Sequence, residues 1–108
     1  MSARFVIATT AFVCGLLPAT AAQEAGLVEA GARIARESCV SCHSIDGGSV
    51  KLRAGAAPAF AAIAAMPSTT EVAIKEFLQT PHANMPNIML TQNEIDALAA
   101  YILDFRNK

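Results

Sequence analysis

The sequence has few large aromatic side chains and no concentration of charge of either sign. Its 108 residues, enough for one domain, include no tryptophan, one tyrosine and five phenylalanines. Lysine and arginine total 8 against 9 aspartates and glutamates, which gives a formal net charge of -1, and no basic run occurs. A protein that binds nucleic acid needs a basic surface to neutralise phosphates. The composition therefore predicts no nucleic-acid partner.

The first 22 residues have the composition of a secretory signal peptide. A positively charged start at 1–4 is followed by an almost uninterrupted apolar stretch over 5–17, which Pro18 ends. Small residues follow at 19–22, as signal peptidase requires. The apolar run is short for a bilayer, which takes about 20 apolar residues to cross. We therefore expect secretion across the inner membrane into the periplasm.

Cleavage is expected just before Ala22 or Gln23. It would remove residues 1–22, leave one domain over residues 23–108 and leave no stable membrane insertion. The alternative is that the leader is retained as a membrane anchor. Cleavage would also remove Cys14, so that only two of the three cysteines remain.

The two remaining cysteines belong to a C-x-x-C-H motif. Cys39, Cys42 and His43 supply its thiols and its imidazole. Thiols at this spacing can each add to one vinyl group of the same haem, and the adjacent histidine can then bind the iron from one side. The motif therefore predicts one haem c, with its iron, attached covalently through Cys39 and Cys42, and His43 as an axial ligand.

Other uses of a C-x-x-C pair fit this sequence less well. A dithiol redox motif is usually found near a βαβ unit, and no such pattern is present. A zinc site needs a second pair of ligands, whereas His82 is the only other histidine. A disulfide across two residues would be strained.

An electron-transfer haem needs a second axial ligand, and the sequence offers four candidates. Met85 lies in the segment 81–87, where two prolines exclude a regular helix, and such a loop can hold a thioether against the iron. Met66 and Met89 are interpreted as apolar packing residues, because methionine fills irregular gaps well. His82 would give a bis-histidine site instead. Met85 is our prediction for the second metal ligand.

The rest of the chain predicts an all-α domain. No alternation typical of strands occurs, and apolar residues recur at helical spacing in several segments. Two capping-box patterns, a Ser or Thr followed three residues later by Glu, mark helix starts. We expect the first and last helices to pack across each other. The expected helices cover 25–38, 58–65, a segment from the capping box at 68–71 to just before Pro81, and a last helix opened by the capping box at 91–94.

Over its mature length the chain resembles a class I c-type cytochrome. Gly31, eight residues before Cys39, matches a glycine that lets the terminal helices of that family cross closely. Met85 and the final helix with Tyr101 follow the motif in the family's order. The resemblance implies the cytochrome c fold, about four helices around one covalently bound haem. It also implies that the carbonyl of Pro58 accepts a hydrogen bond from the axial histidine.

The resemblance further implies a single-electron carrier that is not an enzyme. His43 and Met85 would be its axial ligands, and it would shuttle electrons between respiratory or dehydrogenase partners through transient contacts, as a monomer. One alternative is a cytochrome c subunit of a larger oxidoreductase complex. The other, if Met85 is not a ligand, is a five-coordinate haem protein that binds gases or acts like a peroxidase.

The sequence departs from the family pattern at three points. Ala35 stands where the family often has an aromatic residue that packs on the terminal tyrosine, so we expect Tyr101 to pack differently. Ala57 replaces the usual glycine before Pro58. After cleavage the nine acids face seven basic residues, a charge of about -2, which does not favour steering toward a strongly acidic partner.

Overall fold

The computed structural model describes residues 19–47, 57–80 and 85–108. Helices account for most of this part of the chain, and no strand occurs in it. The all-α class is therefore confirmed. The elements are α1 (Ala19–Ser38), α2 (Phe60–Ala65), α3 (Glu71–Gln79), α4 (Gln92–Asp104) and the 3-10 turn η1 (Phe105–Asn107).

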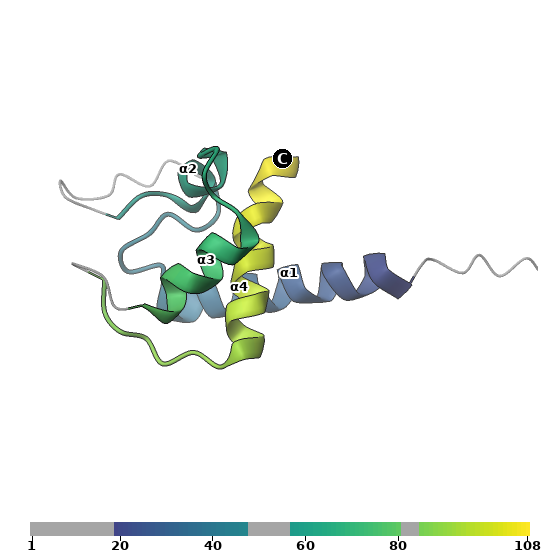
Figure 1. Ribbon diagram of the computed structural model, residues 1–108, viewed down its shortest axis with the longest axis horizontal. Helices are drawn as coiled ribbons and strands as arrows, with labels where there is room; N and C mark the ends of the chain where they lie inside the picture. The colour runs from purple at the N-terminus through teal and green to yellow at the C-terminus, as the bar shows by residue number, and fades with distance from the viewer. Residues whose placement is uncertain (1–18, 48–56, 81–84) are drawn as a thin grey trace, which may run out of the picture.

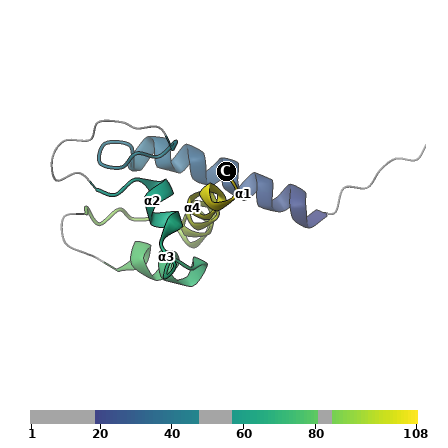
Figure 2. The same ribbon diagram turned by 90° about the horizontal axis from the view of Figure 1, so that it is seen from above.

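The two long helices, α1 and α4, cross each other as expected (Figure 1). Figure 2 views α4 nearly end-on, with α2 and α3 on the same side of α1 as α4. At the crossing, a Cβ atom on Gly31 would lie 2.1 Å from the carbonyl oxygen of Ala97 and 2.6 Å from Cβ of Tyr101. Such distances are far below van der Waals contact. Only glycine therefore permits this approach of the two backbones.

The centre of the domain is built largely from small and aliphatic side chains around the crossing. Ala35 and Ala99 are fully buried, and Leu98 is the largest side chain that is fully enclosed. Small residues on facing helices let the backbones come close, so a thin core can still be densely packed. The remaining buried members of the cluster are Ala32, Cys39, Ile45, Phe60, Ala64, Ile74, Tyr101 and Ile102.

Helix α1 begins six residues earlier than the apolar pattern predicts. The pattern starts at residue 25, whereas the helix starts at Ala19. Residues 20–26 are exposed, so they carry no apolar stripe, yet alanine and glutamine favour helix on their own. The expected cleavage position lies in this exposed part of α1. Residues 1–18 of the leader, Cys14 among them, lie outside the described residues.

Helices α3 and α4 begin at different kinds of cap. At α4 the predicted capping box is present: the Thr91 hydroxyl accepts from the Glu94 amide at 3.4 Å, and the Glu94 carboxylate accepts from the Thr91 amide at 2.7 Å. The box predicted at 68–71 is wrong. Thr70 caps α3 instead, accepting from the Ala73 amide at 3.1 Å.

A turn explains the shifted start of α3. The Thr69 amide donates to the carbonyl of Met66 at 3.0 Å, so residue 68 lies in a closed turn before the helix. Glu71 is then the first residue of the helix rather than its third. In that position it forms an ion pair of 2.5 Å with Lys75, which also pairs with Asp96 of α4 at 2.9 Å. The carboxylates of two helices thus share one lysine.

No helix in the described ranges is long and apolar enough to cross a bilayer.

Candidate functional site

The C-x-x-C-H motif continues directly from the end of α1. The amide of Cys39 donates to the carbonyl of Ala35 at 2.9 Å. The amides of Cys42 and His43 both donate to the carbonyl of Cys39, at 3.1 and 2.9 Å. This helix-like turn places His43 four residues, or about one helical turn, beyond Cys39. The backbone bonds therefore bring the motif together locally, without help from the distant chain.

The two thiols are free, and they differ in exposure. Cys39 is buried and Cys42 is exposed, and neither forms a disulfide. Burial raises the pKa of the Cys39 thiol, because an apolar environment disfavours the thiolate. No group of three or more histidine, cysteine, aspartate or glutamate side chains that could hold a metal ion occurs within 19–47, 57–80 and 85–108. His82 lies outside these ranges.

The ring of His43 is held from two sides. Its Nδ1 atom lies 2.6 Å from the carbonyl oxygen of Pro58, and its ring centroid lies 5.3 Å from that of Phe60. A carbonyl can only accept, so Nδ1 must carry the hydrogen and donate it. The other ring nitrogen, Nε2, is then left with its lone pair. His43 is therefore held in the tautomer that binds a metal through Nε2.

The segments that carry His43 and Pro58 are also joined through their backbones. The amide of Phe60 donates to the carbonyl of Ser44 at 2.9 Å. Ser44 and Phe60 are buried, so this bond is shielded from water. The hydrogen bond to the imidazole and this backbone bond together fix how residues 43 and 44 sit against the start of α2.

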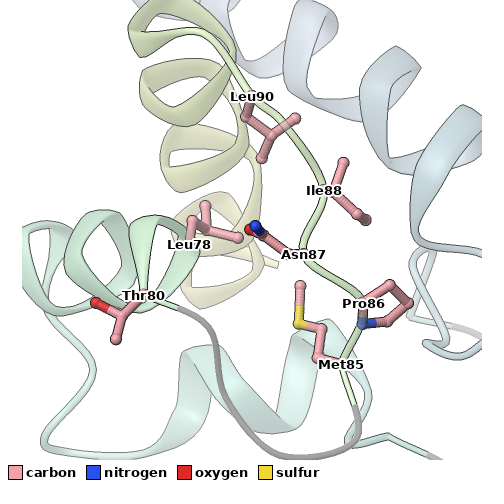
Figure 3. Close-up of a pocket in the computed structure, with 7 residues that line it drawn as sticks. All are labelled: Leu78, Thr80, Met85, Pro86, Asn87, Ile88 and Leu90. Atoms are coloured by element: carbon pink, nitrogen blue, oxygen red, sulfur yellow. The ribbon is translucent and has the colours of Figure 1, made fainter.

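Met85 lies on a separate, non-helical segment that precedes α4. It lines a pocket formed between this segment and the end of α3, together with the side chains of Leu78, Ile88 and Leu90 (Figure 3). Thr80, Pro86 and Asn87 complete the lining. The Met85 side chain extends into this pocket, with its sulfur drawn in yellow. A methionine thioether is one of the side-chain ligands that haem iron accepts.

The other two methionine candidates occupy different places. Met66 caps the C-terminal end of α2 and is 46% exposed, and Met89 is 88% exposed. Neither of them lines the pocket that contains Met85. The structure thus distinguishes the three methionines by their surroundings, with Met85 alone among apolar neighbours in that pocket.

Two residues near the C-terminus matter for the site more than their sequence pattern suggests. Tyr101 is buried, and its hydroxyl donates to the carbonyl of Ile45 at 2.5 Å, two residues after His43. Its ring lies edge-on to those of Phe105 and Phe60, with centroid separations of 5.4 and 6.2 Å. Tyr101 thus has two aromatic neighbours in this structure, and neither of them comes from position 35.

Arg106, in η1, was missed by sequence analysis. Its Nε donates to the carbonyl of Ala64 at 2.7 Å, and its Nη2 donates to the carbonyls of Met66, at 3.4 Å, and Thr69. These acceptors lie 37 to 42 residues earlier in the chain. A lone arginine near a chain end gives no local signal for such contacts. Only its place directly after an apolar helix could have drawn attention to it.

Comparison with known proteins identifies the family of the chain. Residues 26–102 match the family model described as cytochrome C oxidase, cbb3-type, subunit III. The chain is also 36% identical over 76 residues to a cytochrome c-552 of Bradyrhizobium diazoefficiens, a match that covers 70% of this chain and 72% of the relative. No solved structure matches.

The chain therefore belongs to the c-type cytochromes. Within them it is a small class I protein with one haem. Membership implies a covalently bound haem c with its iron, and an electron-carrying role for that group. The residues present fit such a group, because both thiols of the motif are free and the tautomer of His43 leaves Nε2 available.

Proposed function

We propose that the protein is a single-electron carrier of the periplasm with His/Met axial ligation. Cys39 and Cys42 would hold the haem, and His43 and Met85 would be the ligands of its iron. The observation that carries the proposal is the hydrogen bond of 2.6 Å from His43 to Pro58, which selects the metal-binding tautomer next to two free thiols. When bound, the haem supplies the iron that takes up and releases one electron.

His43 and Met85, as ligands on the two sides of the iron, would shift its reduction potential in opposite directions. Donation from Nδ1 of His43 to the carbonyl of Pro58 makes the imidazole a stronger donor, which favours the oxidised iron. The thioether of Met85 favours the reduced iron, as does an apolar pocket that excludes water. With both ligands in place no coordination position is left for a substrate, which supports a carrier rather than an enzyme.

The surface charge supports brief encounters with partners. After removal of residues 1–22 the chain would carry nine acidic and seven basic side chains. This small imbalance gives weak steering, and redox partners usually meet through small, transient interfaces. We propose that the mature domain, residues 23–108, works as a monomer that exchanges electrons with respiratory or dehydrogenase proteins.

Absorption spectra of the purified mature protein test this proposal. The expected result is haem that survives acid-acetone extraction, a far-red sulfur-to-iron band in the oxidised form, and no change when carbon monoxide is added to the reduced form. Extractable haem would contradict covalent attachment. Rapid binding of carbon monoxide by the unaltered protein would contradict ligation by Met85 and favour a five-coordinate haem protein.

A second candidate function is a cytochrome subunit of a larger oxidoreductase complex. The description of the matching family model, an oxidase subunit, favours it. The haem chemistry would be the same, but the domain would not diffuse freely. Size-exclusion chromatography of gently solubilised source membranes separates the two, because a subunit elutes with a large partner and a free carrier elutes alone.

A further inference from the structure

We propose that Tyr101 and Arg106 are positioning residues for His43. They hold the two chain segments that meet at the hydrogen bond between His43 and Pro58, and so they fix the imidazole ring from a distance. This inference rests on the proposed role of His43 as an axial ligand, and it extends that role to the C-terminal end of the fold.

The hydrogen bond that orients His43 joins two segments separated along the chain. The donor and the acceptor are 15 residues apart, one on the turn after α1 and the other just before α2. The amide of Phe60 also donates to the carbonyl of Ser44, so a second hydrogen bond joins the same two segments. Each such bond adds little net stability, so contacts of both segments with a common frame would add to the hold on the imidazole. Helix α4 and η1 supply that frame.

Tyr101 attaches the first segment to α4. Its hydroxyl donates to the carbonyl of Ile45 at 2.5 Å, and both residues are buried. Burial raises the pKa of Tyr101, so the hydroxyl stays protonated and remains a donor at physiological pH. Because Ile45 follows His43 by two residues, this bond limits how far the turn that carries the imidazole can move.

Arg106 attaches the second segment to η1. Its guanidinium donates to the carbonyls of Ala64, Met66 and Thr69, at and beyond the C-terminal end of α2. Carbonyls at a helix end lack partners within the helix, and a planar guanidinium can satisfy several of them at once. Figure 1 shows α2 beside the C-terminal end of α4. Since α2 has only six residues, fixing its end also fixes its start, where Pro58 and Phe60 lie.

A row of aromatic rings links the two attachments. The ring centroid of Phe60 lies 5.3 Å from that of His43 and 6.2 Å from that of Tyr101. The ring centroids of Tyr101 and Phe105 are 5.4 Å apart. A Cβ atom on Gly47 would lie 3.3 Å from the Phe105 ring, so η1 also rests against the end of the first segment. A shift of either segment would therefore be felt at the imidazole through packing as well as through hydrogen bonds.

Loosening either attachment should weaken donation from His43 to Pro58. An imidazole that donates less is a weaker ligand and stabilises the oxidised iron less. The reduction potential should then shift to more positive values. The Nδ1 hydrogen of His43 should also exchange faster with solvent, by about fivefold, because its bond opens more often. A general loss of stability alone would not be expected to produce both the shift in reduction potential and the faster exchange.

The test compares substitutions at the two attachments in the mature holoprotein. Tyr101→Phe keeps the ring and removes only the donor to Ile45. Arg106→Ala removes all three donations, whereas Arg106→Lys keeps the charge and can serve fewer carbonyls. We expect Tyr101→Phe and Arg106→Ala to raise the potential and to speed exchange of the His43 hydrogen. Arg106→Lys should lie between Arg106→Ala and the unaltered protein, and a folded Arg106→Lys suffices if Arg106→Ala does not fold.

Two control variants separate positioning from stability and from charge. Thr91→Ala removes the cap at the opposite end of α4, so it should lower the melting temperature without moving the potential or the exchange rate. Arg33→Ala removes another exposed arginine of α1, one that does not act on the Tyr101 hydroxyl, and should leave both readouts unchanged. If Thr91→Ala moves both readouts as much as Tyr101→Phe does, the positioning role is refuted.

The unaltered holoprotein is measured first, by NMR in its oxidised form. Paramagnetically shifted ring signals from His43 establish it as a ligand, whatever the second ligand is. Their absence would overturn the proposed function, and this inference with it. If the signals are present, and both Tyr101→Phe and Arg106→Ala keep the potential and the exchange rate of the unaltered protein, the inference alone is overturned.

Discussion

The two sides of the proposed haem site are built in different ways. On the histidine side, Ser44, Ile45 and Phe60 are buried, and hydrogen bonds join three stretches of chain around His43. On the methionine side, residues 85–90 form no helix, and all of them are half-buried or exposed. The chain therefore supplies many buried contacts around His43, whereas the segment that carries Met85 is more open. Substitutions on the two sides should therefore have different effects on folding, stability and haem ligation.

The largest effect is expected on the histidine side. Cys42→Ala or His43→Ala should leave little folded protein, because the haem supplies much of the core of so small a domain. Far-ultraviolet circular dichroism and haem absorbance of the purified variants provide the measurement. A stable, native, haem-free fold from either variant would contradict this expectation.

The crossing of α1 and α4 at Gly31 should be the position where a substitution has the next largest effect on stability. Gly31→Ala forces a Cβ atom to 2.1 Å from a backbone oxygen, so the helices must separate, and we expect a loss of about 3 kcal/mol or more. Gly26→Ala, on the same helix with nothing within 4 Å of the new Cβ, should stabilise by about 0.5–1 kcal/mol. Urea unfolding of the two holoproteins checks both values. Equal losses would refute the close crossing.

Opening the methionine side should cost less than either change. Met85→Ala should keep the covalent haem and the fold, lose about 1–3 kcal/mol of stability, and bind carbon monoxide in the reduced state. Haem content, urea unfolding and carbon monoxide difference spectra measure the three properties. Loss of haem from this variant would show that the two sides are not organised independently.

The smallest effect concerns acid at the start of α4. Hydrogen bonds from Thr91 hold the pKa of Glu94 below its usual range, and the hydrogen bond from Lys75 does so for Asp96. A carboxyl whose pKa is lower in the folded state stabilises the fold at pH values above its unfolded pKa of about 4. This stabilisation is lost as the pH falls below that value through the folded pKa.

The melting temperature should therefore fall on acidification through this range. Glu94→Gln keeps a residue suited to a capping box but cannot titrate, so its acid dependence should be shallower. Melting curves between neutral and acidic pH test this. An identical acid dependence in the variant and the unaltered protein would rule out the contribution of Glu94.

What the sequence predicts well is what local chemistry determines. The capping box at Thr91 placed the start of α4 correctly, because both of its hydrogen bonds are made within four residues. The pattern at 68–71 failed, since a turn closed by Met66 and Thr69 moves the cap to Thr70. The motif gave the thiols and the imidazole, but not the way in which they are held.

The long-range parts of the site lay beyond sequence reasoning. Arg106 reaches carbonyls about 40 residues earlier, and backbone acceptors leave no mark in the side chains of their own residues. The sequence places Tyr101 beside the apolar stripe of its helix, but its acceptor at Ile45, 56 residues away, depends on how α4 crosses α1. Contacts of this kind follow from the assembled fold, whereas caps and motifs follow from neighbouring residues.

The central claim, a carrier whose iron is bound by His43 and Met85, is tested most directly by the far-red absorption band of the oxidised protein in two matched variants. Met85→Ala should abolish the sulfur-to-iron band, and Met89→Ala, which alters an 88% exposed methionine four residues away, should leave it intact. A band that persists in Met85→Ala, or that disappears in Met89→Ala, would contradict the assignment of the ligand.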